Sequence, residues 1–176
     1  QVFLILHACG AQITLCMMVT LVLFLSKRWI RGDNEGEGAA RKPVRFYAKL
    51  AIALLCAQLL LGAMVGHFDA AVICGANFPL LTHEFQGFAS LFPTHFNAQT
   101  VTHYLHRFLA FGVVLVILRF VTVAWRQAFI RKHHGFWVIA LAGMIAVQFF
   151  LGALVVWTMR NPHAATLHTL GGAMGL

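Results

Sequence analysis

The sequence predicts an all-α fold, a polytopic membrane bundle of helices, and three observations support this. Hydrophobic residues fill 60% of the 176 positions and charged residues only 10%, with a mean hydropathy of +0.80. Soluble domains carry roughly 25% charged residues. Several apolar runs reach the roughly 20 residues that a helix needs to cross a bilayer. Basic residues flank these runs in two clusters, so we expect a lipid bilayer to surround most of the chain.

Five apolar segments are predicted to be helical, in order 2–26, 46–66, 99–125, 135–158 and 164–176. The first is read as a true span, because it lacks the basic leader and the small-residue cleavage site of a signal peptide. The last stops after about a dozen residues, which is too short to span. Since the chain also starts inside an apolar run without Met, we expect a fragment of a longer protein.

Charge assigns the helix ends to two sides of the membrane. The basic stretches 27–49 and 119–132 belong on the cytoplasmic or matrix side, where Lys and Arg collect beside spans. Residues 67–98 contain Asp69 and Glu84 but no Lys or Arg, which places this loop outside. The net charge of +8 is thereby explained by topology, and we expect no nucleic-acid partner.

An internal repeat predicts how the chain is organised. Residues 58–65 and 148–155 share the pattern QxxLGAxV, and residues 6–10 and 167–171 share LHxxG. Such repeats in membrane proteins reflect duplicated bundles around a shared site. We therefore predict three parts, namely the last helix of a preceding four-helix unit (1–26), an inner basic loop (27–45) and a four-helix heme-binding unit with a truncated last helix (46–176).

Histidines are the main functional clue, because ten occur in a chain this apolar and polar groups in lipid usually have a partner or a purpose. His7, His106 and His168 fall near the outer ends of helices, at comparable depth. Two histidines on facing helices, about 4 Å apart across an iron, can hold heme. His103 shares a helical face with His106 and either fits on spacing alone. We prefer His106, which lies deeper and precedes Arg107, a cation suited to a heme propionate.

Structural roles stay open for the same residues. His106 can instead be a hydrogen-bonded contact between helices, and Arg107 a cation that extends to the interface. Other histidines fall in loops or at helix ends, with no spacing typical of a closed copper or iron site: His67, His83, His95, His133, His134 and His163. The four cysteines form no CxxC pair, so a zinc site or a disulfide framework is not expected.

Over nearly its whole length the chain resembles the heme A synthase family, as the C-terminal half preceded by the last helix of the N-terminal half. The residues that carry the resemblance are, in order, LGAMV at 61–65, FDAA at 68–71, NFPL at 77–80, Asn97, His106-Arg107, QFFLGA at 148–153 and Leu167-His168. The resemblance implies an eight-helix membrane oxidoreductase of two pseudosymmetric four-helix halves. It oxidises a methyl group of heme O to the formyl group of heme A for terminal oxidases.

The resemblance also implies roles for single residues. His106 and His168 would be the axial ligands of a heme B iron, with Arg107 beside it, and His7 would contact the substrate heme. The catalytic residues are unknown, because they belong to the half that the chain lacks. Some members carry a cysteine pair in the outer loops, and here Cys74 has no second cysteine in its loop.

Its implied setting is a bacterial cell membrane rather than the mitochondrial inner membrane, with the histidine sites near the outer face. The expected partners are heme O, an electron-transfer partner, and heme O synthase or terminal oxidase assembly factors, and a homo-oligomer stays open. Two other functions fit the same residues. One is a b-type cytochrome that carries electrons between a quinol and a partner, and the other is a heme-free scaffold for oxidase assembly.

Overall fold

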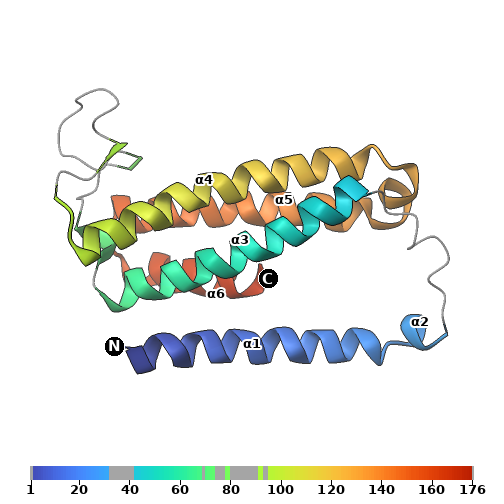
Figure 1. Cartoon of the computed structure of the whole chain (residues 1–176), viewed down its shortest axis with the longest axis horizontal. Coiled ribbons are helices and arrows are strands. Elements are labelled where there is room, and N and C mark those ends of the chain that lie inside the picture. Colours follow the sequence, from blue (N-terminus) through green and yellow to red (C-terminus); the bar gives the residue numbers. More distant parts are fainter. Residues whose placement is uncertain are drawn as a thin grey trace.

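The computed structural model describes residues 2–31, 42–68, 70–73, 78–79, 91–92 and 95–175, and within them it is helical, with no strand. The elements in chain order are α1 (Val2–Phe24), α2 (Lys27–Ile30), α3 (Lys42–His67), the short 3-10 helix η2 (Ala70–Val72), α4 (Ala98–Trp125), α5 (Ala128–Trp157) and α6 (Pro162–Met174) (Figure 1). The predicted all-α fold is confirmed.

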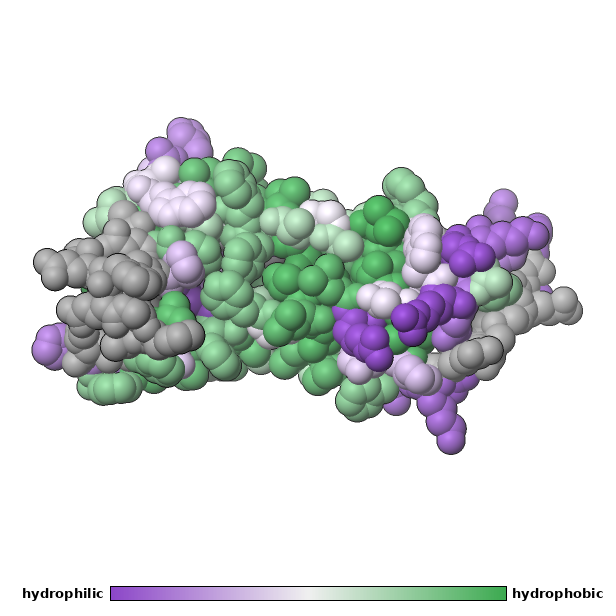
Figure 2. Space-filling model, turned by 90° about the horizontal axis from the view of Figure 1, so that it is seen from above, coloured by the Kyte–Doolittle hydropathy of each residue, from purple (hydrophilic) through white to green (hydrophobic). Residues whose placement is uncertain are grey.

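Three of these helices, α3, α4 and α5, are long and apolar enough to cross a membrane. Large apolar side chains point away from the bundle on them, with Leu115 67% and Trp137 68% exposed. Figure 2 shows a broad hydrophobic surface between two hydrophilic ends. Apolar exposure on this scale is unfavourable in water and favourable in lipid. The chain is therefore a multi-pass membrane protein, as its composition predicted.

Consecutive helices are neighbours, since α3 packs along α4, α4 along α5 and α5 along α6. Their shared core is small and includes Ala51, Val113, Ile117 and Ile145. α1 lies against α3 and away from α4 (Figure 1). The helices α3 to α6 thus form one packed group, with α1 on its outside.

Two predicted helix boundaries were wrong, because helices continue past the apolar runs into the basic segments. α3 begins at Lys42 instead of 46, and α5 begins at Ala128 instead of 135. His133 and His134 consequently lie on α5 and not in a loop between helices. Hydropathy falls at the first charged residues, but long basic side chains reach water from the end of a helix without ending it.

Candidate functional site

His106 on α4 and His168 on α6 face each other although their helices are not consecutive. Their ring centroids are 6.4 Å apart and their planes cross at 82°. An imidazole nitrogen lies about 2 Å from a bound metal and about 1 Å from its own ring centre. Two imidazoles on opposite sides of one iron therefore have centroids roughly 6 Å apart. The observed spacing suits a single iron between the two rings.

The helices that carry this pair both begin at an asparagine cap. The side chain of Asn97 accepts a hydrogen bond from the backbone N–H of Thr100 (2.8 Å) at the start of α4. Asn161 accepts from the N–H groups of His163 and Ala164 at the start of α6. At about 1.5 Å per residue, His106 lies roughly 13 Å and His168 roughly 10 Å along its helix from the cap. Both histidines thus lie at comparable distances from the starts of their helices.

Each histidine ring fits against a glycine on the preceding helix. A Cβ atom at Gly62 of α3 would lie 3.2 Å from Cε1 of His106, and one at Gly152 of α5 would lie 3.1 Å from Cε1 of His168. Those distances are shorter than ordinary van der Waals contact. The QxxLGAxV repeat therefore performs the same task twice, because each copy makes room for the histidine of the next helix.

The glutamine of each repeat copy also lies in the site, and the sequence did not predict its role. Nε2 of Gln58 donates to the backbone carbonyl of His106 (3.1 Å) and lies 3.5 Å from Nε2 of that ring. Only the amide nitrogen can donate to a carbonyl, so this bond fixes the orientation of the amide. The amide of Gln148 packs where a Cβ of Gly171 would stand. The signal was present in the repeat, where Gln precedes Gly by one helical turn.

Four buried polar atoms around the histidines lack a hydrogen-bond partner within the described residues. They are Oε1 of Gln58, Oε1 of Gln148, Nδ1 of His106 and Nδ1 of His168. A buried polar atom without a partner costs about 1–3 kcal/mol. Such atoms are rare in native proteins and indicate a bound water, ion or ligand. Two facing imidazole rings, the glycines packed against them and the unsatisfied polar atoms together fit a metal-bearing group such as heme.

Arg107 and His103 form a buried pair beside this site. Nε of Arg107 donates to Nε2 of His103 (2.9 Å), and the guanidinium lies 5.6 Å from the ring centre of Phe78. Since arginine is always protonated, Nε2 of His103 is an acceptor and its ring carries the proton on Nδ1. Arg107 is only 6% exposed, so it does not extend out of the bundle. Of the two histidines on this face of α4, His106 is the one that faces His168.

The other candidate residues lie away from the His106–His168 pair. His7 is exposed on α1, and its assignment to a separate heme site stays a prediction. His133 and His134 pack on Phe129. No group of three or more metal-ligating side chains occurs within the described ranges, and Cys9, Cys16 and Cys56 are free. The predictions on Asp69, Cys74, His83 and Glu84 lie outside the described residues.

Fold and geometry define a polytopic helical membrane protein with two facing histidines in its bundle. Comparison with known families then identifies it, because the COX15-CtaA family, described as cytochrome oxidase assembly protein, matches residues 1–176. The chain belongs to this family, and the resemblance inferred from its motifs is confirmed.

Similar curated proteins carry the name heme A synthase. The protein from Novosphingobium aromaticivorans is 30% identical over 155 residues, which cover 78% of this chain and 41% of that protein. The protein from Staphylococcus epidermidis is 26% identical over 129 residues, which cover 73% of this chain and 40% of that protein. The chain thus spans about two fifths of the length of these relatives. No solved structure matches it.

Proposed function

We propose that this chain is the cofactor-holding part of a heme A synthase, the membrane oxidoreductase that converts the methyl group of heme O to the formyl group of heme A. Family membership and the name of the similar proteins support this. The observation that carries it is the pair His106 and His168, whose rings are spaced as two ligands of one iron.

In this proposal a heme B is bound between the two histidines. Held by both histidines, this heme would supply electron transfer rather than oxygen chemistry, since two protein ligands would leave no open coordination position for oxygen. The chain holds and orients the ligands. Gly62 and Gly152 give the rings room, and the bond from Gln58 ties down the backbone of His106. Arg107 follows His106 on α4, and its Nε donates a hydrogen bond to His103. A guanidinium held in this position is suited to neutralise a heme propionate.

The substrate side of the proposal rests on α1. His7 is exposed on a helix that packs on the outside of the α3 to α6 group. Such a position suits a second heme site shared with a further bundle, where heme O would be oxidised. The expected partners are an electron acceptor, heme O synthase and terminal oxidase assembly factors. A bacterial cell membrane, with the histidine sites near its outer face, is the proposed location.

Pigment extraction tests the proposed activity. The intact protein that contains this chain is purified from membranes, and its hemes are extracted and separated by chromatography. We expect heme B together with heme O or heme A. Heme B alone would contradict the synthase and favour a b-type cytochrome that carries electrons between a quinol and a partner. A preparation with no Soret absorption would contradict both and favour a heme-free assembly scaffold.

A further inference from the structure

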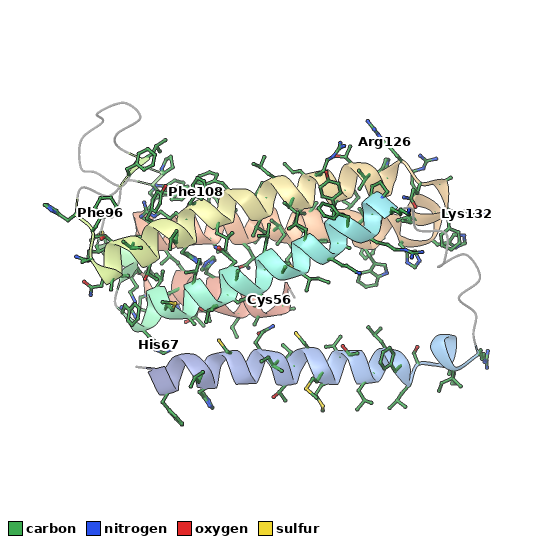
Figure 3. The ribbon with its side chains drawn as sticks, in the orientation of Figure 1. Cys56, His67, Phe96, Phe108, Arg126 and Lys132 are labelled. Carbon is green, nitrogen blue, oxygen red and sulfur yellow. The ribbon has the colours of Figure 1, made fainter. Side chains whose placement is uncertain are left out.

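A second concave site lies at the end of the bundle away from the outer loops. Pro43 at the start of α3 and four residues near the end of α4 line a half-open cavity of ≈ 240 Å³, namely Arg119, Val123, Arg126 and Gln127. Arg126 lies at this end of the molecule and His67 and Phe96 at the other (Figure 3). Arg126 lies 20 residues beyond His106, or roughly 30 Å along α4, so the cavity is separate from the histidine pair and needs its own explanation.

Positive charge dominates this cavity. Arg119 and Arg126 are two helical turns apart and therefore project from one face of α4, and both are exposed. All five acidic residues of the chain lie outside the described residues, so no carboxylate within the described part neutralises them. The guanidinium of Arg119 lies 5.7 Å from the ring centre of Tyr47, which restricts its direction.

The depth of the two arginines indicates the kind of anion. Arg119 precedes the end of α4 at Trp125 by six residues, or about 9 Å of helix, and Arg126 follows that end directly. A bilayer has headgroup layers roughly 5–8 Å thick on each side of its hydrocarbon core. One arginine therefore reaches this layer from the hydrocarbon side and the other from the water side. A lipid phosphate is the anion present at that level.

Size and location narrow the ligand further. Sites that enclose a whole small molecule measure roughly 300–1,000 Å³, and this cavity is smaller and open on one side. It suits a headgroup whose acyl chains remain in the bilayer. The end of the bundle that carries the cavity is also the end where Lys and Arg cluster, which is the cytoplasmic side by the positive-inside rule. Guanidinium groups bind phosphate oxygens through paired N–H donors.

We propose that this cavity binds the phosphate headgroup of an anionic phospholipid of the inner leaflet, with Arg119 and Arg126 as its ligands. The lipid contacts α3 and α4 at once, since the cavity is lined by Pro43 of α3 and Val123 of α4. The α3 and α4 helices also carry Gly62 and His106 further along the bundle. A lipid at this end would therefore hold α3 and α4 together, and these two helices form half of the histidine site.

Lipid binding is measured by native mass spectrometry of the intact protein released from nanodiscs that contain phosphatidylglycerol or phosphatidylcholine. The test variant is Arg119→Gln/Arg126→Gln. The control variant is Arg31→Gln/Lys132→Gln, which removes the same charge from exposed residues that do not line the cavity. We expect wild type and control to retain phosphatidylglycerol in preference to phosphatidylcholine. The test variant should retain it at least about tenfold less, because two charge-assisted hydrogen bonds are lost.

Three results decide between this site and its alternatives. Equal loss in test and control variants would overturn the proposal and leave only bulk attraction between a basic surface and anionic lipid. Release of phosphatidylglycerol by millimolar inorganic phosphate would overturn the lipid assignment and indicate a site for a free anion. If the double variant fails to fold, judged by its absorption spectrum and thermal unfolding, the single variants Arg119→Lys and Arg126→Lys replace it. Retention as strong as wild type in both would count against paired guanidinium ligands.

Discussion

The two copies of the repeat, α3 with α4 and α5 with α6, present a histidine in the same manner but support it differently. In both copies a glycine lies within about one contact distance of the histidine Cε1, at 3.2 Å and 3.1 Å for a built Cβ. In the first copy Gln58 donates to the backbone of His106. In the second copy Gln148 instead packs over Gly171 of the helix that carries His168.

This difference separates what the two proposed ligand histidines require from what can vary around them. Room for the ring is present in both copies, because a small residue opposite an imidazole lets the two helices approach closely. The support follows the local packing. α4 is capped by a reciprocal pair of hydrogen bonds and tied to α3 by Gln58, whereas α6 is capped by the Asn161 side chain and packs closely on α5 at Gly171. The α6 side should therefore be the more sensitive one.

The largest expected effect is the loss of either histidine. His106→Ala and His168→Ala should each abolish the low-spin b-type spectrum of the purified protein, since both axial positions are needed for it. His163→Ala is the matched control, because this histidine is exposed at the start of the same helix as His168. A low-spin spectrum that survives in His168→Ala would refute the ligand assignment. Protein yield is measured in parallel, because loss of a bound group also lowers stability.

The next largest effect concerns Gly62 and Gly152, the glycines against which the two histidine rings pack. Gly152→Ala and Gly62→Ala should lower the ratio of bound heme to protein and reduce stability by about 1–3 kcal/mol through overpacking. Gly152→Ala should be the more severe, because three atoms of the His168 ring lie within 3.6 Å of the new Cβ, against one at 3.2 Å and one at 3.8 Å for His106 at Gly62.

Gly143 lies on the same helix as Gly152 and supplies the control for both glycine substitutions. Nothing lies within 4 Å of a Cβ at this position. Gly143→Ala should leave heme content unchanged and stabilise the helix by roughly 0.5–1 kcal/mol. Equal effects of Gly143→Ala and Gly152→Ala on heme content would show that the space at Gly152 is not required for heme binding.

The sequence predicted part of this arrangement, and the same residues show which part. The apolar runs and the repeat predicted the helices, and the spacing predicted that His106 and His168 share a depth. What Gly62 and Gln58 contact could not be predicted, since it depends on which faces of α3 and α4 meet, and a single sequence does not contain that information. The start of α5 was missed for another reason, because its first turns are basic and helical at once.

A smaller effect tests the close approach of α6 to α5. Gly171→Ala places a methyl group where the amide of Gln148 lies. The Gln148 side chain is flexible and can move, so the expected loss is about 1 kcal/mol. Adding Gln148→Ala should recover most of it, and the two changes should therefore be strongly non-additive in thermal unfolding. Strictly additive losses would mean that the two side chains do not compete for this space.

The smallest effect distinguishes the two glutamines and bears directly on the difference between the copies. Gln58→Met removes the hydrogen bond to the His106 carbonyl and should cost about 1 kcal/mol whether or not heme is bound. Gln148→Met removes a buried oxygen that has no partner in the described residues, so it should be neutral or stabilising in heme-depleted protein. If that oxygen is satisfied only when heme and its ordered waters are present, Gln148→Met should destabilise the heme-loaded form alone. Thermal unfolding of both variants, with and without heme, measures this, and equal behaviour of the two glutamines would contradict the inferred difference in support.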